Sequence, residues 1–290
     1  MTAPAEPPEP DDAAERDADA EPTAAAESGP AAQPAGRPDA TVAASDDLAP
    51  HQRAARVHRM GRRVPLIAGG IAVAMGALLG LVIAVRAGGL PLGVDEEWSL
   101  ELAEAHSPAA DVFALFMNML GGGIVGVILV PVGITIALLV LRRPWAALYF
   151  ALASAGSALV VQVLKELYGR PRPEDMMVTS DFGSFPSGHV ANAATIAVAL
   201  GVIVPRVWVW VAGAVYTVLM AISRTYLGVH WLTDTIGGAL VGAGVALLLW
   251  AAFAVPLERE RLARLARASE RNAALAQAHV TPPSHPRPPR

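Results

Sequence analysis

The 290-residue chain contains no cysteine. That absence excludes disulfide frameworks, thiolate metal sites and cysteine nucleophiles. Lysine is nearly absent too, because Lys165 is the only one beside 21 arginines. Charge of either sign is scarce over residues 64–255, where only 19 of 192 residues are Asp, Glu, Lys or Arg. So long a stretch with so little charge argues against a single soluble domain and favours a membrane protein.

Hydrophobic residues make up 53% of the chain, and the mean hydropathy is +0.42. They form uncharged runs that approach or exceed the roughly 20 residues needed to cross a hydrocarbon core. The runs predict an all-α polytopic membrane protein with a bundle of six transmembrane helices, at residues 64–85, 112–141, 144–164, 190–205, 207–223 and 235–257. The second run is long enough to include a re-entrant or interfacial approach before Gly121.

The regions outside the runs differ in composition. Residues 1–50 hold 12 acidic groups and nine prolines, which predicts a disordered acidic tail, and their acidic start without an apolar core is not that of a secretory signal. Residues 51–63 form a basic flank before the membrane domain at 64–255. Residues 256–290 form a basic tail, expected to be helical at first and then Pro-rich and disordered.

Basic residues near the ends of the predicted helices indicate the orientation of the chain. An N-terminus on the cytoplasmic side places 13 arginines in the cytoplasm and five basic residues outside. We therefore expect an integral protein of the plasma (inner) membrane with both termini in the cytoplasm. The loops after the first, third and fifth helices then face outward.

Polar side chains beside membrane helices are costly, which makes them candidates for function, and three clusters of them fall on the outward side. Lys165, at the end of the third helix, indicates a need for a compact ammonium group, although alone it fits an interfacial residue equally well. Arg172 and Pro173 follow it. Ser187, Gly188 and His189 begin the fourth helix, where free N–H groups favour an anion such as phosphate, yet alone they fit an ordinary helix cap.

The third cluster lies between the fifth and sixth helices. Arg224 supplies a planar guanidinium suited to phosphoryl oxygens. His230 and Asp234 are four residues apart, so on a helix the carboxylate can accept from one ring nitrogen and leave the other as a nucleophile. A structural His-Asp pair would have the same spacing, so it is the convergence of all three clusters on one side that indicates a catalytic site.

The three clusters match one pattern without a gap. In chain order its residues are Lys165, Arg172 and Pro173, then Pro186, Ser187, Gly188 and His189, then Ser223, Arg224, His230 and Asp234. This pattern resembles the three-part signature of the type 2 phosphatidic acid phosphatase family, whose superfamily includes vanadium haloperoxidases and glucose-6-phosphatases. The resemblance covers residues 64–255 and makes this membrane domain a phosphatase domain.

The resemblance implies a role for each residue. His230 would attack phosphorus, Asp234 would orient it, and His189 would protonate the leaving group. The phosphoryl oxygens would be bound by Lys165, Arg172, Ser187, Gly188 and Arg224. No metal and no other cofactor is expected, since three cations already face the phosphate. Arg170, which the signature does not require, is either an extra phosphate contact or a loop charge, and we favour the loop charge.

The function that follows is hydrolysis of a membrane lipid phosphomonoester or pyrophosphate, such as phosphatidic acid, phosphatidylglycerophosphate or a polyprenyl pyrophosphate. A phosphotransferase would use the same residues. A lipid-phosphate binding or transport protein is the non-catalytic alternative, although binding alone does not need both a nucleophile and an acid. The expected partners are the lipid substrate and the membrane, with no nucleic acid. The oligomeric state and the lipid stay open.

Overall fold

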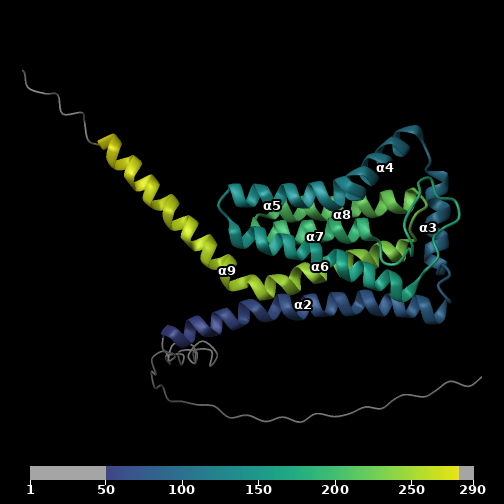
Figure 1. Cartoon of the computed structure of the whole chain (residues 1–290), viewed down its shortest axis with the longest axis horizontal. Helices are drawn as coiled ribbons and strands as arrows, with labels where there is room; N and C mark the ends of the chain where they lie inside the picture. The colour runs from purple at the N-terminus through teal and green to yellow at the C-terminus, as the bar shows by residue number, and fades with distance from the viewer. Residues whose placement is uncertain (1–49, 281–290) are drawn as a thin grey trace, which may run out of the picture. The chain divides into compact units, whose positions relative to one another are not determined.

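The computed structural model describes residues 50–280, and every regular element in that range is a helix, as the composition predicts (Figure 1). The helices are α2 (Pro50–Arg86), α3 (Gly93–Glu104), α4 (Pro108–Gly121), the π-helix η1 (Val125–Leu129), α5 (Val130–Val140), α6 (Pro144–Tyr168), α7 (Gly188–Ile203), α8 (Val207–Tyr226) and α9 (Leu232–Val280). The predicted disordered tail at residues 1–50 and the Pro-rich end at 281–290 lie outside the described residues, apart from Pro50.

Four helices are long and apolar enough to cross a membrane. They are Gly61–Arg86, Pro144–Tyr168, Val207–Tyr226 and Leu232–Leu275. A fifth crossing results if α4 and the helix Val125–Val140, which bend by 47° at a short break, count as one span. The predicted fourth span is the 16-residue α7, about 24 Å long, which falls short of a hydrocarbon core of about 30 Å. Helices occupy all the predicted segments, but that six of them cross the membrane stays a prediction.

The long second run is broken next to Gly121, close to where the sequence indicates a change. Gly122 is extended, with φ −140° and ψ −170°, and Gly123 has a left-handed φ of 57° that a side chain would disfavour. The chain resumes as the π-helix η1 before α5. The break brings backbone groups of residues 118–126 close to α7, and this proximity shapes the candidate site.

Helices α7 and α9 pack with their backbones close together. A Cβ atom at Gly242 would lie 2.1 Å from the carbonyl oxygen of Ala191, and one at Gly238 would lie 2.5 Å from that of Ser187. In a membrane the hydrophobic effect does not drive helices together, and small residues promote association by allowing close van der Waals packing. Thr195 Oγ1 adds a hydrogen bond of 3.2 Å to the Gly242 carbonyl. The amino ends of α7 and α9 are thereby held next to each other.

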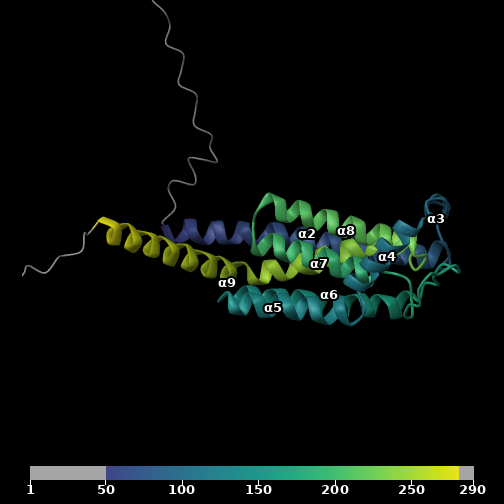
Figure 2. The same cartoon turned by 90° about the horizontal axis from the view of Figure 1, so that it is seen from above.

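Helices α2 and α9 run side by side, and α9 continues beyond the bundle (Figures 1 and 2). The Arg62 guanidinium donates to the Ala251 carbonyl at 3.0 Å. Helix α9 runs without interruption to Val280, so the predicted helical tail is continuous with the last span. At the opposite end of the bundle, beside α3, lie the carboxyl ends of α6 and α8 and the amino ends of α7 and α9 (Figure 1).

Candidate active site

A cavity of about 1000 Å³ opens where these four helix ends meet. Residues from all three sequence clusters line it, namely Lys165 from α6, Gly188 and His189 from α7, Arg224 from α8 and His230 from the loop before α9. Asp234 and Ser187 lie directly behind this lining, since the Ser187 N–H donates to the Asp234 carbonyl at 3.0 Å. The structure thus brings together clusters that are up to 69 residues apart.

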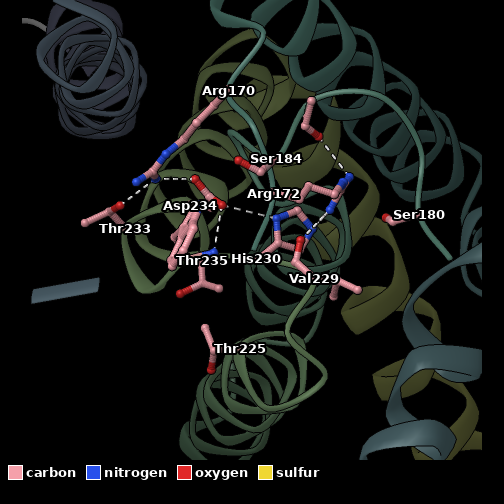
Figure 3. A network of polar contacts seen from close by, with 12 residues as sticks. Arg170, Arg172, Ser180, Ser184, Thr225, Val229, His230, Thr233, Asp234 and Thr235 are labelled. Carbon is pink, nitrogen blue, oxygen red and sulfur yellow. Dashed lines mark hydrogen bonds and ion pairs between the residues drawn. The ribbon is translucent and has the colours of Figure 1, made fainter. Parts of the chain in front are cut away.

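His230 and Asp234 face each other, as their spacing predicts (Figure 3). His230 Nδ1 lies 3.5 Å from Asp234 Oδ2, at ion-pair distance rather than at the distance of a normal hydrogen bond. On the other side of the ring, Arg172 Nη1 lies 3.3 Å from Nε2. Because a guanidinium can only donate, Nε2 accepts and the ring proton belongs on Nδ1, facing Asp234. The lone pair of Nε2 then points away from Asp234, toward Arg172.

Arg172 is fixed by several acceptors. Nη1 donates to the Val229 carbonyl, Nη2 donates to the Gly183 carbonyl at 2.8 Å, and Nη2 also pairs with Asp181 Oδ1 at 2.7 Å. Two of these acceptors are backbone groups, so the orientation of Arg172 depends on the loops around it. The guanidinium is placed to bind an oxygen of any group that Nε2 of His230 attacks.

Lys165 is buried although it ends a membrane helix. Its Nζ donates to both carboxylate oxygens of Asp181, at 3.0 Å each, and to the Gly183 carbonyl at 3.1 Å. The lone lysine therefore points into the site instead of reaching out to the interface. Asp181 pairs with both Lys165 and Arg172.

His189 lies against the break between α4 and η1. Its Nε2 is 3.2 Å from the Asn118 carbonyl. A Cβ atom at Gly122 would lie 2.0 Å from that same nitrogen, so only glycine leaves room for the ring. Helix α7 positions His189, and the backbone at the break in the second span packs against its ring.

Several buried side-chain atoms of the site have no hydrogen-bond partner among residues 50–280, including His230 Nδ1, Ser187 Oγ and Arg224 Nε. Ser187 and Arg224 are at most 1% exposed. Arg224 Nη1 does donate to Asn118 Oδ1. Buried donors without acceptors are costly, so Ser187 Oγ and Arg224 Nε are positioned to receive the oxygens of a bound anion.

The interpretation of Arg170 as a loop charge is wrong. Its side chain is 1% exposed, and one Nη atom pairs with Asp234 Oδ1 at 2.6 Å (Figure 3). The other Nη atom pairs with Asp95 Oδ2 at 2.7 Å. Nη1 also donates to Thr233 Oγ1 at 2.8 Å. Arg170 is therefore the ion-pair partner of the carboxylate that faces His230. It could not be recognised from the sequence because its partners lie 64 and 75 residues away.

The sequence analysis also missed Asp95, Asn118 and Asp181. Asp95 lies in an acidic segment that looks solvated, and Asn118 is a lone amide in an apolar run. The single available signal was Asp181, an acid a few residues before the Ser187 cluster. Among the described residues, no three His, Cys, Asp or Glu side chains are grouped as metal ligands would be. The charged side chains that line the cavity are Lys165, Arg224 and Asp181.

The electrostatics of the site favour a neutral His230. Burial, followed by the positive charges of Arg224, Arg172 and Lys165, lowers the pKa of His230 well below its ordinary value of 6.5. Burial acts to raise the pKa of Asp181, but hydrogen bonding and charge from Lys165, with the charge of Arg172, outweigh it and lower that pKa. His230 is therefore uncharged, and Asp181 is ionised, at neutral pH.

All three sequence clusters lie within residues 146–256, and this segment matches the PAP2 superfamily. The chain carries a PAP2 domain. The family resemblance drawn from the motifs is thereby confirmed. The match spans the chain from α6 into α9 and leaves α2 to α5 outside.

Similarity to curated proteins is confined to part of each chain. Phosphatidylglycerophosphatase B of Bacillus subtilis is 36% identical over 112 residues, which cover 35% of this chain and 55% of that protein. An undecaprenyl-diphosphatase of Sulfolobus acidocaldarius is 40% identical over 78 residues, 27% of this chain and 34% of that protein. The chain thus spans between a third and just over half of the length of these relatives.

A solved structure extends the likeness beyond the PAP2 domain. The crystal structure of a transmembrane PAP2-type phosphatidylglycerolphosphate phosphatase from Bacillus subtilis superposes with a TM-score of 0.56 at 28% identity. The superposition covers 62% of this chain and 93% of that one. The chain therefore has the helical architecture of a membrane PAP2 protein.

Proposed function

We propose that this protein is a membrane lipid phosphatase that hydrolyses a lipid phosphomonoester or pyrophosphate through a phosphohistidine. The observation that carries the proposal is a nucleophilic nitrogen, His230 Nε2, beside Arg172 and in a cavity with buried Lys165 and Arg224. The partnerless donors Ser187 Oγ and Arg224 Nε complete an oxyanion-binding set. The names of the PAP2 relatives support the same reaction class.

In the first step, His230 Nε2 forms a bond to phosphorus while the bond from phosphorus to the lipid oxygen breaks. His189 gives its proton to the departing oxygen, which leaves as an alcohol or as a lipid phosphate. The ring of His230 becomes a cation, and the Asp234 carboxylate stabilises it without taking up the proton from Nδ1. The phosphoryl oxygens are bound by Lys165, Arg172, Arg224, Ser187 and the Gly188 N–H, the last a free group of the first turn of α7.

In the second step, water attacks the phosphohistidine. Neutral His189 takes a proton from the water as its oxygen bonds to phosphorus, and the bond to Nε2 breaks. Inorganic phosphate leaves, and both histidines return to their starting states. The basic side chains supply the positive charge that the transferred group needs, so we propose that the reaction requires no metal ion.

The shape of the cavity favours a lipid substrate. Its lining on α6 extends from Ala151 to Lys165, a length of about 21 Å along the helix. Away from the cations the wall is largely apolar, with Val132, Ile136, Ala151, Ala155, Ala158 and Val161 among its residues. A soluble phosphate ester would fill only the polar end, whereas an acyl or prenyl chain fills the remainder.

The membrane orientation belongs to the same proposal. The excess of arginines on one side places both termini in the cytoplasm and the cavity at the outer face of the plasma membrane. The active domain is proposed to be the six-helix unit at residues 64–255. A lipid phosphate of the outer leaflet would then reach the site directly.

The experiment is phosphate release by purified protein in detergent, with EDTA present. The panel contains phosphatidic acid, phosphatidylglycerophosphate and a polyprenyl pyrophosphate, with glycerol 3-phosphate as a substrate that lacks the chain. We expect release from at least one lipid at a kcat/KM far above that for glycerol 3-phosphate. Binding without release would indicate a binding or transport protein, and transfer of labelled phosphate to an added alcohol would indicate a phosphotransferase.

A further inference from the structure

Asp95 of α3 is fully buried, and both of its carboxylate oxygens are occupied. Oδ1 accepts from the Thr233 N–H at 2.8 Å. Oδ2 accepts from Arg170 Nη2 at 2.7 Å, from Thr233 Oγ1 at 2.9 Å and from the Leu92 N–H at 3.1 Å. A buried carboxylate that accepts from this many donors is held in one orientation. Asp95 lies outside the PAP2 match and outside the signature motifs.

Arg170 joins this carboxylate to the catalytic pair. One Nη atom contacts Asp234 and also donates to the Thr233 hydroxyl (Figure 3). The other Nη atom contacts Asp95, and the Thr233 hydroxyl donates to Asp95 as well. Asp234 in turn faces His230 at 3.5 Å. The chain of contacts therefore runs from α3, through the loop after α6, to the first turn of α9 and the nucleophile.

The charges along this chain explain why two acids are present. Asp234 and Arg170 alone would sum to zero, so the carboxylate behind His230 would be largely cancelled by its own partner. Asp95 adds a second negative charge, so the buried trio of Asp95, Arg170 and Asp234 has a net charge of −1. That sum equals the charge needed to balance His230 when phosphoryl transfer makes its ring a cation.

We infer that Asp95 is a positioning residue that acts through Arg170, keeping Asp234 fixed in place while preserving the net negative charge that supports a cationic His230. The inference rests on the proposed phosphohistidine chemistry. The inference gives α3 a part in the reaction. The carboxylate of Asp95 on this helix supplies the negative charge that Arg170 otherwise cancels at Asp234.

The pH behaviour of His230 provides the test, because it reports the charge around the ring. The charged and titratable groups that face or neighbour His230 come from each element around it: Lys165 of α6, Arg170 and Arg172 of the following loop, Asp181 of the same loop, His189 of α7, Arg224 of α8 and Asp234 of α9. Substitution of Asp95 or Arg170 leaves all the other groups in this list unchanged.

The trio predicts opposite effects for two variants. Asp95→Asn removes a negative charge, so the acid limb of kcat/KM should move to lower pH by about 0.5 to 1 unit, and kcat should fall about 10- to 100-fold with little change in KM. Arg170→Gln removes a positive charge, so the acid limb should move to higher pH. The double variant, which again has a net charge of −1, should return the limb toward its wild-type position.

The matched control is Trp98→Phe, also on α3. Trp98 Nε1 donates to Thr225 Oγ1 at 3.0 Å and does not contact the trio, so its loss weakens the attachment of α3 without changing the charge near His230. We expect a lower melting temperature and an unchanged pH profile. If Asp95→Asn behaves in the same way as this control, the inference is wrong and Asp95 is purely structural.

A readout without turnover separates this inference from the proposed function. Diethyl pyrocarbonate acylates neutral imidazole, and peptide mass spectrometry of the intact protein treated across a pH series reports the titration of His230. The midpoint should shift in opposite directions in Asp95→Asn and Arg170→Gln, even in a protein that releases no phosphate. Equal midpoints in the two variants would overturn the inference, and they would leave the proposed phosphatase activity to be judged by phosphate release alone.

Discussion

Lys165 Nζ lies 3.0 Å from each carboxylate oxygen of Asp181. Asp181 also pairs with Arg172 at 2.7 Å, so one acid occupies two of the cations that are proposed to bind phosphate. Its side chain is 56% exposed, and it belongs to the loop between α6 and α7. The carboxylate therefore competes with a substrate for the same positive charge.

Removal of this competitor should strengthen anion binding. In Asp181→Asn, we expect the inhibition constant of orthovanadate to fall about 5-fold, which corresponds to about 1 kcal/mol for an exposed charge interaction. Glu174→Gln, in the same loop and also exposed, serves as the control for loss of one negative charge. Weaker inhibition in Asp181→Asn would show that the carboxylate organises the cations more than it competes with the anion.

His230→Ala should abolish the covalent intermediate. Turnover should fall by at least about 10³-fold, because no other nucleophile occupies that position. Labelled substrate and rapid acid-free quenching would measure the acid-labile phosphoenzyme. The control is His106→Ala, which removes a ring stacked on Tyr226 at 4.3 Å and should keep the intermediate. A phosphoenzyme in the His230 variant would exclude this residue as nucleophile.

His189→Ala should show a loss that depends on the leaving group. A lipid alkoxide needs a proton as it departs, whereas nitrophenolate does not. We expect phosphoenzyme formation from a nitrophenyl phosphate to be largely retained and that from the lipid to be slowed by about 10²-fold or more. Equal losses on the two substrates would remove the acid assignment.

The lowered pKa of His230 predicts activity that persists into mildly acidic solution. The neutral ring is the nucleophile, and its pKa lies well below 6.5, so protonation should begin to reduce kcat/KM only below that pH. The measurement is kcat/KM for a soluble aryl phosphate across pH 4 to 9. An acid limb centred at 6.5 or above would contradict the electrostatic description of the site.

Sidedness can be tested by single cysteines, since the native chain has none. Glu174→Cys, in the exposed loop next to the site, should react with a membrane-impermeant maleimide in intact cells. Ser269→Cys, on the exposed part of α9, should react only after permeabilisation. Asp181 is unsuitable as a probe position because of its ion pairs. The reverse labelling pattern would place the active site in the cytoplasm.

Local spacing was enough to predict that His230 and Asp234 face each other. His230 and Asp234 are four residues apart, and Ser187, Gly188 and His189 adjoin the start of one helix, so neighbours in sequence are neighbours in space. The uncharged runs located the helices for a similar reason, because the hydrocarbon core selects for local composition. The bend after Gly121 coincides with glycines that permit it.

Partners that meet only through packing could not be predicted. Arg170 and Asp95 are 75 residues apart, and each lies in a polar segment that reads as solvated. The contact of Asn118 with both His189 and Arg224 depends on where the broken second span meets α7 and α8. These contacts involve residues outside the signature, so the signature does not predict them.

The close backbone contact of α7 and α9 at Gly238 and Gly242 has a mechanical consequence. Helix α7 carries His189 and lines the cavity, and it packs closely against α9, which carries Asp234, so the proposed acid and the proposed orienting carboxylate keep their mutual geometry. The opposite wall is formed by η1, α5 and part of α6. That wall contains a bent junction and a π-helix, so lipid exchange should proceed by its outward movement, with the reacting groups stationary throughout.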